Sequence, residues 1–419
     1  MAERLAAAPA RLARRARRLL GYWRSERRTL RQGAVALTLS TGAGFVAGLT
    51  LAHITPTLEA LPGLIVLIPA AAGMKGTIFG AIAARIGTAS AAGTFEPTLE
   101  PGGELRRSVW VALLTTLASS LWLAVLARLV SAALGGPSAS IWSLLAISVV
   151  GGALGSAFIL LITVGLSVVS HRRGWDLDSV STPMVTALGD MTTLPFLFLA
   201  TFLVHDPTLR NVTVALCLIG TVIGIVRLWS TGGPLVRRVV IEMAGVILLT
   251  PLLDVLAGGL LREWEPSLLA VPVLLSLIPP FVSQAGALGG IFASRITSKL
   301  QIGVITPRGL PEVPAVVDAS IVLGFGVAVF ALIGAIAFGL GELTGLGGMP
   351  SAVAMIGATV VAGLLVTPLT IVSGYYLAVS TYRFGLDPDN QTIPIITSLM
   401  DLIGVAAILF VMRTSGVLP

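Results

Sequence analysis

Residues 64–97, LIVLIPAAAGMKGTIFGAIAARIGTASAAGTFEP, return without gaps as LLSLIPPFVSQAGALGGIFASRITSKLQIGVITP at residues 274–307. The two stretches share the pattern L..LIP, then G...G..A.RI, and finally G...P. Similarity of this length within one chain indicates a duplicated structural unit. The chain is therefore expected to contain two copies of one fold.

A second pair of stretches supports the duplication. DSVSTPMVTALGDMTTL at residues 178–194 aligns with DNQTIPIITSLMDLIGV at residues 389–405. The spacing between the first and second motif differs by a single residue between the two copies. Each copy keeps a proline, a threonine and an aspartate: Pro183 and Pro394, Thr186 and Thr397, Asp190 and Asp401.

The composition predicts an all-α integral membrane protein. Of the 419 residues 55% are hydrophobic and 11% are charged, and the mean hydropathy is +0.95. Soluble domains carry about 25% charged residues. Apolar windows of about 20 residues, each long enough to cross a bilayer as a helix, recur along the chain. Eleven spans are expected: 33–54, 58–86, 108–134, 140–171, 179–205, 211–230, 238–261, 267–298, 314–341, 350–381 and 391–413.

The spans divide into two parallel halves. Five helices form the first half, residues 33–205, and five form the second, residues 238–413. An odd-numbered unit fused to its copy would be inverted, but the extra span within 206–237 restores the same orientation. The halves are then related by a pseudo-two-fold axis along the membrane normal, as in transporters with parallel repeats. One chain is thus expected to work as a pseudo-dimer.

Positive charges predict the orientation and a lipid partner. Ten of the 27 Lys and Arg lie within residues 1–32, which we interpret as a basic amphipathic segment on anionic lipid at the cytoplasmic face, not as a nucleic-acid-binding region. More Lys and Arg fall in the inner loops than in the outer ones, the pattern of a multi-pass plasma-membrane protein. The N-terminus is then cytoplasmic, and the tail 414–419 is extracytoplasmic.

The sequence lacks the residues of a catalytic or structural metal site. Cys217 is the single cysteine, and the three histidines have no metal-ligand spacing. No nucleophile–base set or nucleotide-binding motif is present, so the chain is not expected to be an enzyme or to hold a cofactor.

Asp190 and Asp401 are the candidate ion-binding residues. An ionised carboxylate at mid-membrane costs at least about 2.5–3.5 kcal/mol, and two that face each other also repel. A hard divalent cation such as Mg²⁺ compensates this cost, because it takes oxygen ligands and needs only one or two carboxylates. The hydroxyls of Thr186 and Thr397 are candidate partners of the ion or its waters.

Further residues are candidates for lining the pathway. Lys75 interrupts the second span and has no basic counterpart in the second half, so it could neutralise the site or extend to the interface. Proline and glycine breaks at corresponding positions of two halves point to a transport site and suggest unwound or closely packed helices there. The candidate lining residues are Gly73, Lys75, Gly76, Thr77, Gly286, Ala287, Pro183 and Pro394.

Other charged residues receive structural interpretations. Asp254 and Asp318 lie nearer helix ends, where wetted interface positions explain them at least as well as ion contact. Arg85 and Arg295 are expected to anchor helices at the cytoplasmic surface.

The motifs LIPAAAGMKG…AARIGTA and FASRITSKL, with the paired proline–aspartate helices, resemble the membrane domains of the MgtE and solute carrier family 41 magnesium transporters. The resemblance covers residues 33–413 and implies that Asp190 and Asp401 coordinate Mg²⁺ at the centre of a pore. The family's second helix usually continues Gly-Asn, whereas here Thr77 follows Gly76 and Ala287 follows Gly286. The chain also lacks a soluble stretch large enough for the regulatory domains of MgtE.

Two functions follow from these observations. The first is transport of a divalent cation, most simply Mg²⁺, with Mn²⁺, Co²⁺ and Ca²⁺ as alternatives. The second is proton-coupled transport of a small organic solute, in which Asp190 and Asp401 share a proton in place of a metal. The scarcity of polar side chains that would recognise an organic group favours the first.

Overall fold

The computed structural model describes residues 27–91, 100, 103–135, 138–173, 177–231, 234–345, 350–386 and 388–418, for some of them the backbone only. Most of the basic segment 1–32 lies outside these residues. The long helices are α3 (Arg27–His53), α5 (Leu64–Ala91), α6 (Glu104–Ala133), α7 (Ile141–Arg173), α8 (Leu177–Thr201), α9 (Pro207–Thr231), α10 (Pro234–Glu263), α12 (Pro272–Gln301), α13 (Val313–Thr344), α14 (Ala352–Arg383) and α15 (Pro388–Thr414).

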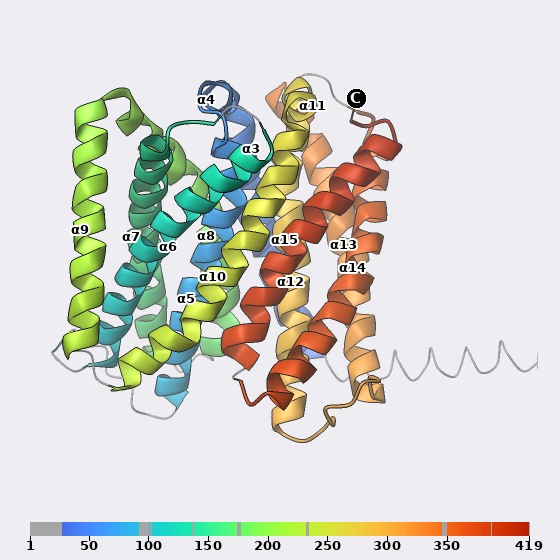
Figure 1. Ribbon diagram of the computed structural model, residues 1–419. Helices are drawn as coiled ribbons and strands as arrows, with labels where there is room; N and C mark the ends of the chain where they lie inside the picture. The colour runs from blue at the N-terminus through green and yellow to red at the C-terminus, as the bar shows by residue number, and fades with distance from the viewer. Residues whose placement is uncertain are drawn as a thin grey trace, which may run out of the picture.

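The described residues form an all-helical bundle, as the composition predicts (Figure 1). Among the described residues, ten helices are long and apolar enough to cross a membrane, judged by length and composition. Helix α5 adds a shorter apolar stretch, Leu64–Phe79, within the described residues. The expectation of an all-α integral membrane protein is confirmed.

Two spans begin later than expected because a short helix precedes each of them. Helix α4 (Thr55–Ala60) ends before α5, and α11 (Glu265–Ala270) ends before α12. The joining residues Leu61 and Val271 have non-helical ψ angles of 74°, and each stands directly before a proline. Proline disfavours the helical conformation of the preceding residue, so the chain breaks at the same place in both halves.

The two halves run in the same direction. Helices α4 and α11, which follow the first long helix of each half, both lie at the upper end of Figure 1, together with the C-terminus. Helix α9, which joins the halves, stands at the edge of the bundle. Only 11% of its apolar window is buried inside the molecule, so most of its surface is available to lipid.

Equivalent helices make equivalent contacts across the boundary between the halves. Helix α3 packs on α8 of its own half and on α12 of the other, and α10 packs on α15 and α5. A Cβ atom on Gly48 would lie 2.0 Å from the Ser276 carbonyl oxygen, and one on Gly258 would lie 2.3 Å from the Val66 carbonyl oxygen. The repeat alignment pairs Gly48 with Gly258 and Ser276 with Val66. The halves therefore meet through two equivalent seams where helix backbones approach closely, as small residues allow in membranes.

The proline-containing helices at the boundary remain helical. Helix α5 continues through Pro69, α12 through Pro279 and Pro280, and α15 through Pro394. Of the two expectations for these segments, unwinding is therefore wrong, and close packing holds.

Candidate functional site

Asp190 lies where the first half meets the second. Its Oδ2 atom accepts a hydrogen bond of 2.6 Å from the Ser283 hydroxyl. The Ser283 oxygen also lies 3.3 Å from that of Ser40. These three residues come from α8, α12 and α3, so two helices of the first half and one of the second form this cluster.

Asp401 occupies the equivalent place in the second half. A Cβ atom on Gly73 of α5 would lie 3.3 Å from Oδ2 of Asp401 and 2.7 Å from Oδ2 of Asp254. Asp401 is in α15 and Asp254 is in α10, which makes this the counterpart of the first cluster by helix order. The alignment pairs Gly73 with Ser283, so each aspartate faces the same position of the other half's helix.

The structure thus brings Asp190 and Asp401 to the same boundary from opposite sides. The two carboxylates lie within electrostatic range of each other. No group of three or more His, Cys, Asp or Glu side chains close enough to hold a metal ion occurs within the described part of the chain.

Asp254 lies beside Asp401, and its surroundings decide between the two interpretations of this residue. Its side chain is 0% exposed, so the expectation of a wetted position near a helix end is wrong. Neither carboxylate oxygen makes a hydrogen bond of standard geometry with the described residues. The side chains of Asp401 and Ser398 adjoin it. A buried carboxylate without well-placed partners is costly, which marks this place as one that favours a cation.

Lys75 is buried near the same centre. Its side chain is 1% exposed, and its Nζ atom has no hydrogen-bond partner. A Cβ atom on Gly155 of α7 would lie 2.1 Å from Nζ, so the ammonium group occupies space that a larger residue would fill. Lys75 lies within electrostatic range of Asp190. It therefore stays in the protein interior near this carboxylate instead of reaching the membrane surface.

The threonine and proline candidates are only partly described. In α15 the Thr397 hydroxyl donates to the Pro394 carbonyl at 2.9 Å, and the side chain packs against Gly286. The hydroxyl oxygen keeps lone pairs that could accept a further partner. The side chains of Pro183 and Thr186 lie outside the described residues.

The remaining lining candidates lie along α5 and α12. Thr77 donates to the Gly73 carbonyl at 3.2 Å, so its hydroxyl bonds its own helix. Gly76 lies close to α8, since a Cβ atom on Gly189 would be 3.8 Å from its backbone nitrogen. Ala287 packs against the edge of the hydrophobic core. Gly73 is therefore the member of this set that lies against a carboxylate.

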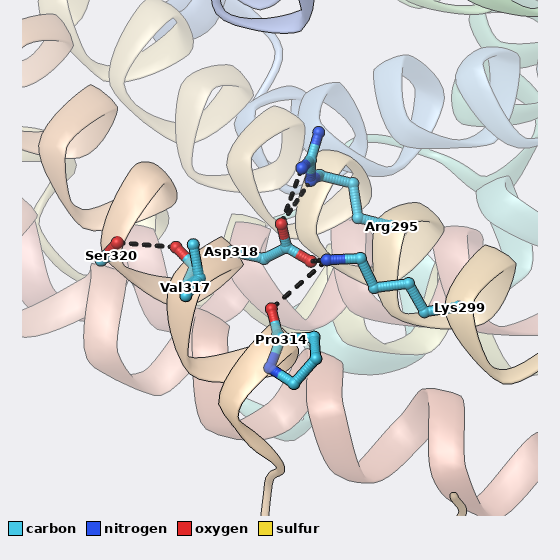
Figure 2. Close-up of polar contacts among 6 residues, drawn as sticks. All are labelled: Arg295, Lys299, Pro314, Val317, Asp318 and Ser320. Atoms are coloured by element: carbon cyan, nitrogen blue, oxygen red, sulfur yellow. Dashed lines mark hydrogen bonds and ion pairs between the residues drawn. The ribbon is translucent and has the colours of Figure 1, made fainter. Parts of the chain in front are cut away.

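Asp318 forms an ion-pair cluster with two basic side chains (Figure 2). Its carboxylate is 0% exposed and accepts from Arg295, with Nη2 2.7 Å from Oδ1, and from the Lys299 ammonium group. Lys299 also donates to the Pro314 carbonyl at 3.3 Å. The expectation of a wetted Asp318 is wrong, because two basic side chains of α12 compensate its charge inside the protein.

The family model MgtE, described as divalent cation transporter, matches residues 68–200 and 278–411, together more than half of the chain. The chain belongs to the MgtE family. The two matched regions fall in the two halves, as expected for two fused membrane domains, and the family consists of transporters and not of enzymes.

Other comparisons add little to the family match. A search of curated proteins finds no significant match. Among solved structures, the eukaryotic MATE transporter AtDTX14 aligns over 94% of this chain and 98% of its own, with 14% identity and a TM-score of 0.33. That TM-score is too low to support an argument about fold or function.

Proposed function

We propose that this MgtE-family protein transports Mg²⁺ along the boundary between its halves, where Asp190 and Asp401 bind the ion. One observation carries the proposal: aspartates at equivalent positions face the same position of the opposite half, Asp190 at Ser283 and Asp401 at Gly73. A path between the halves then meets a carboxylate from each side. Hard oxygen ligands suit Mg²⁺, and Thr186 and Thr397 lie one turn before the aspartates.

The membrane potential supplies a driving force for this ion. Each elementary charge gains about 2.3 kcal/mol per 100 mV on moving inward, so a divalent ion gains about 4.6 kcal/mol. The proposal therefore includes a plasma-membrane location with a cytoplasmic N-terminus, supported by the distribution of Lys and Arg, and a single chain as the working pseudo-dimer.

The test is Mg²⁺ flux into proteoliposomes containing Asp190→Asn, Asp401→Asn and the double variant. Asparagine keeps the shape of the side chain and removes its charge. We expect each single variant to reduce flux and the double variant to abolish it, together with the stabilisation that Mg²⁺ gives the purified protein against heat. Mg²⁺-dependent flux and stabilisation that persist in the double variant would overturn the proposal.

Proton-coupled carriage of an organic solute is the alternative, and the adjacency of Asp254 and Asp401 favours it, since neighbouring carboxylates can share a proton. The same variants separate the two functions. A proton carrier would lose transport in the variants, while its heat stability would not respond to Mg²⁺ even in the unaltered protein. The divalent-cation family favours the first function.

A further inference from the structure

The two halves differ in charge at two buried positions beside the aspartates. The repeat alignment pairs Asp254 with Gly44 and Lys75 with Ala285. The first half therefore has one additional positive side chain, and the second half has one additional negative side chain. Both are almost fully buried, and neither the Asp254 oxygens nor Lys75 Nζ makes a hydrogen bond of standard geometry with the described residues.

The surroundings of Asp401 provide several oxygen atoms without well-placed partners. Asp254 adjoins Asp401, and Gly73 leaves the space that both carboxylates enter. The Ser398 hydroxyl, on the same helix as Asp401, adjoins Asp254, is 0% exposed and makes no hydrogen bond of standard geometry. Ser398 therefore adds a buried neutral oxygen beside the carboxylates, and a buried hydroxyl normally has a well-placed partner.

The surroundings of Asp190 are different. Here the position equivalent to Gly73 is Ser283, whose hydroxyl already donates to the carboxylate. Gly44 provides no second carboxylate, and a Cβ atom there would lie 2.6 Å from the Cα atom of Pro280, so the seam is closed by backbone packing. The Lys75 ammonium group lies within electrostatic range instead.

The charges of the whole centre match a divalent ion. Asp190, Asp254 and Asp401 carry three negative charges when ionised, and Lys75 carries one positive charge. The excess of two negative charges equals that of a symmetric site built from Asp190 and Asp401. The additional acid and the additional base thus compensate each other, and they do so on opposite sides of the boundary.

We propose that the cation binds away from the pseudo-two-fold axis, between Asp254 and Asp401, with the Ser398 hydroxyl as a neutral ligand, and that Lys75 is a positioning residue that balances the charge of Asp190. This inference rests on the proposed function and makes the ion-binding centre asymmetric. Asp401 and Asp254 then hold the resting ion, and Asp190 meets it during passage.

The first test measures the Mg²⁺ concentration that half-maximally stabilises the full-length purified protein against heat. We expect Asp254→Asn to raise this concentration about tenfold or more, which corresponds to about 1.4 kcal/mol. Asp401→Asn should raise it at least as much, and Asp190→Asn should raise it less. A Ser398→Ala variant should give a smaller increase than Asp254→Asn, in the same direction.

The outcomes separate this inference from the proposed function. Asp401→Asn could abolish the stabilisation by Mg²⁺ while Asp254→Asn keeps the half-maximal Mg²⁺ concentration within about twofold of that of the unaltered protein. In that case the off-axis site is wrong and the transport function stands. If the double variant Asp190→Asn/Asp401→Asn keeps both flux and stabilisation, the proposed function fails instead.

A second test examines the charge balance with a double-mutant cycle. Lys75→Met leaves Asp190 without its cation, so we expect a lower melting temperature in the absence of Mg²⁺. Combining it with Asp254→Asn restores the charge of a symmetric site, and the double variant should be more stable without Mg²⁺ than Lys75→Met. Strictly additive effects of the two substitutions would overturn the role of Lys75.

Gly73→Ala tests the same site without removing a charge. The added methyl group would lie 2.7 Å from Oδ2 of Asp254 and 3.3 Å from Oδ2 of Asp401, so the Asp254 carboxylate must shift from its place in the site. We expect a weaker Mg²⁺ response, as in Asp254→Asn. The matched control is Gly42→Ala, where the added group meets nothing within 4 Å and the response should not change. This pair keeps the proposal testable even if Asp254→Asn does not fold.

Discussion

The two halves of the molecule share their backbone packing but not their buried charges. At the seams, Gly48 and Gly258 bring equivalent helices to the same close approach. Beyond the seams, the second half buries Asp318 of α13 between two basic side chains, whereas the first half buries the neutral Ser108 near the start of the corresponding helix α6.

This difference shows which features a fused duplication has to preserve. The close approach of helix backbones tolerates no added atom, so both copies keep glycine there. A buried charge needs only a local partner, so one copy can gain Asp318 or Asp254 without the other. Each copy can thus change its polar groups while the seams keep the halves in register.

The largest effect is expected from Asp318→Asn. The substitution leaves Arg295 and Lys299 beside a neutral group, and removing one partner of a buried ion pair costs about 3–5 kcal/mol. The basic side chains are 17% and 16% exposed, so water compensates part of the loss and the cost should be near about 3 kcal/mol. Thermal unfolding in detergent measures this change.

The control in the first half is Ser108→Ala, which removes a hydroxyl and no charge. Its cost should stay near about 1 kcal/mol, the usual value of one hydrogen bond. Equal losses of stability in Asp318→Asn and Ser108→Ala would mean that the ion-pair cluster does not distinguish the halves.

An intermediate effect is expected from Gly48→Ala and Gly258→Ala. Each added methyl group would meet a carbonyl oxygen of the facing helix, at 2.0 Å and 2.3 Å, so the helices must separate. Overpacking of this kind costs about 1–3 kcal/mol. Melting temperatures should fall by similar amounts in both variants, because the seams are equivalent.

Gly42 in α3 and Gly245 in α10 supply matched controls, since a Cβ atom at either meets nothing within 4 Å. Alanine there should leave stability unchanged or raise it by up to about 1 kcal/mol, because glycine is a poor helix former. A strong loss in only one seam variant would contradict the equivalence of the two seams.

The smallest effect is the component of the pH dependence that Glu265 of the second half contributes. Burial raises the pKa of Glu265 in α11 above its ordinary value of 4.5; Arg262 lowers this pKa, and Glu59 raises it further. The aligned residue of the first half is Thr55. Between pH 4.5 and the folded-state pKa, the folded protein holds a proton that the unfolded chain has lost, so stability falls as pH rises through this window.

Glu265→Gln should remove this component and flatten the dependence of the melting temperature on pH over the same window. Thr55→Val serves as the control in the first half, and its melting temperature should depend on pH as in the unaltered protein. A slope that stays the same in Glu265→Gln would show that the side chain does not couple to unfolding.

Much of the fold could be predicted from the sequence, because a bilayer imposes local rules. Apolar windows showed the spans, and the repeat showed the duplication and therefore the equivalence of Asp190 with Asp401. The breaks before α5 and α12 were missed, although Pro62 and Pro272 signal them. The alignment also pairs Asp254 with Gly44, so the first repeat has no charge at this position. A charged residue inside an apolar span requires a specific neighbour, and this difference could have pointed to Asp254.

The order of residues was enough to identify a duplicated helical membrane protein with an aspartate at matching positions of each copy, because hydropathy and repetition are properties of consecutive residues. The packing of the helices was needed to show that Asp254 adjoins Asp401, that Lys75 is buried near Asp190, and that Asp318 is paired with basic side chains. Those facts depend on which helix faces meet. Contacts between residues far apart in the chain decide whether a polar group meets lipid, water or another charge.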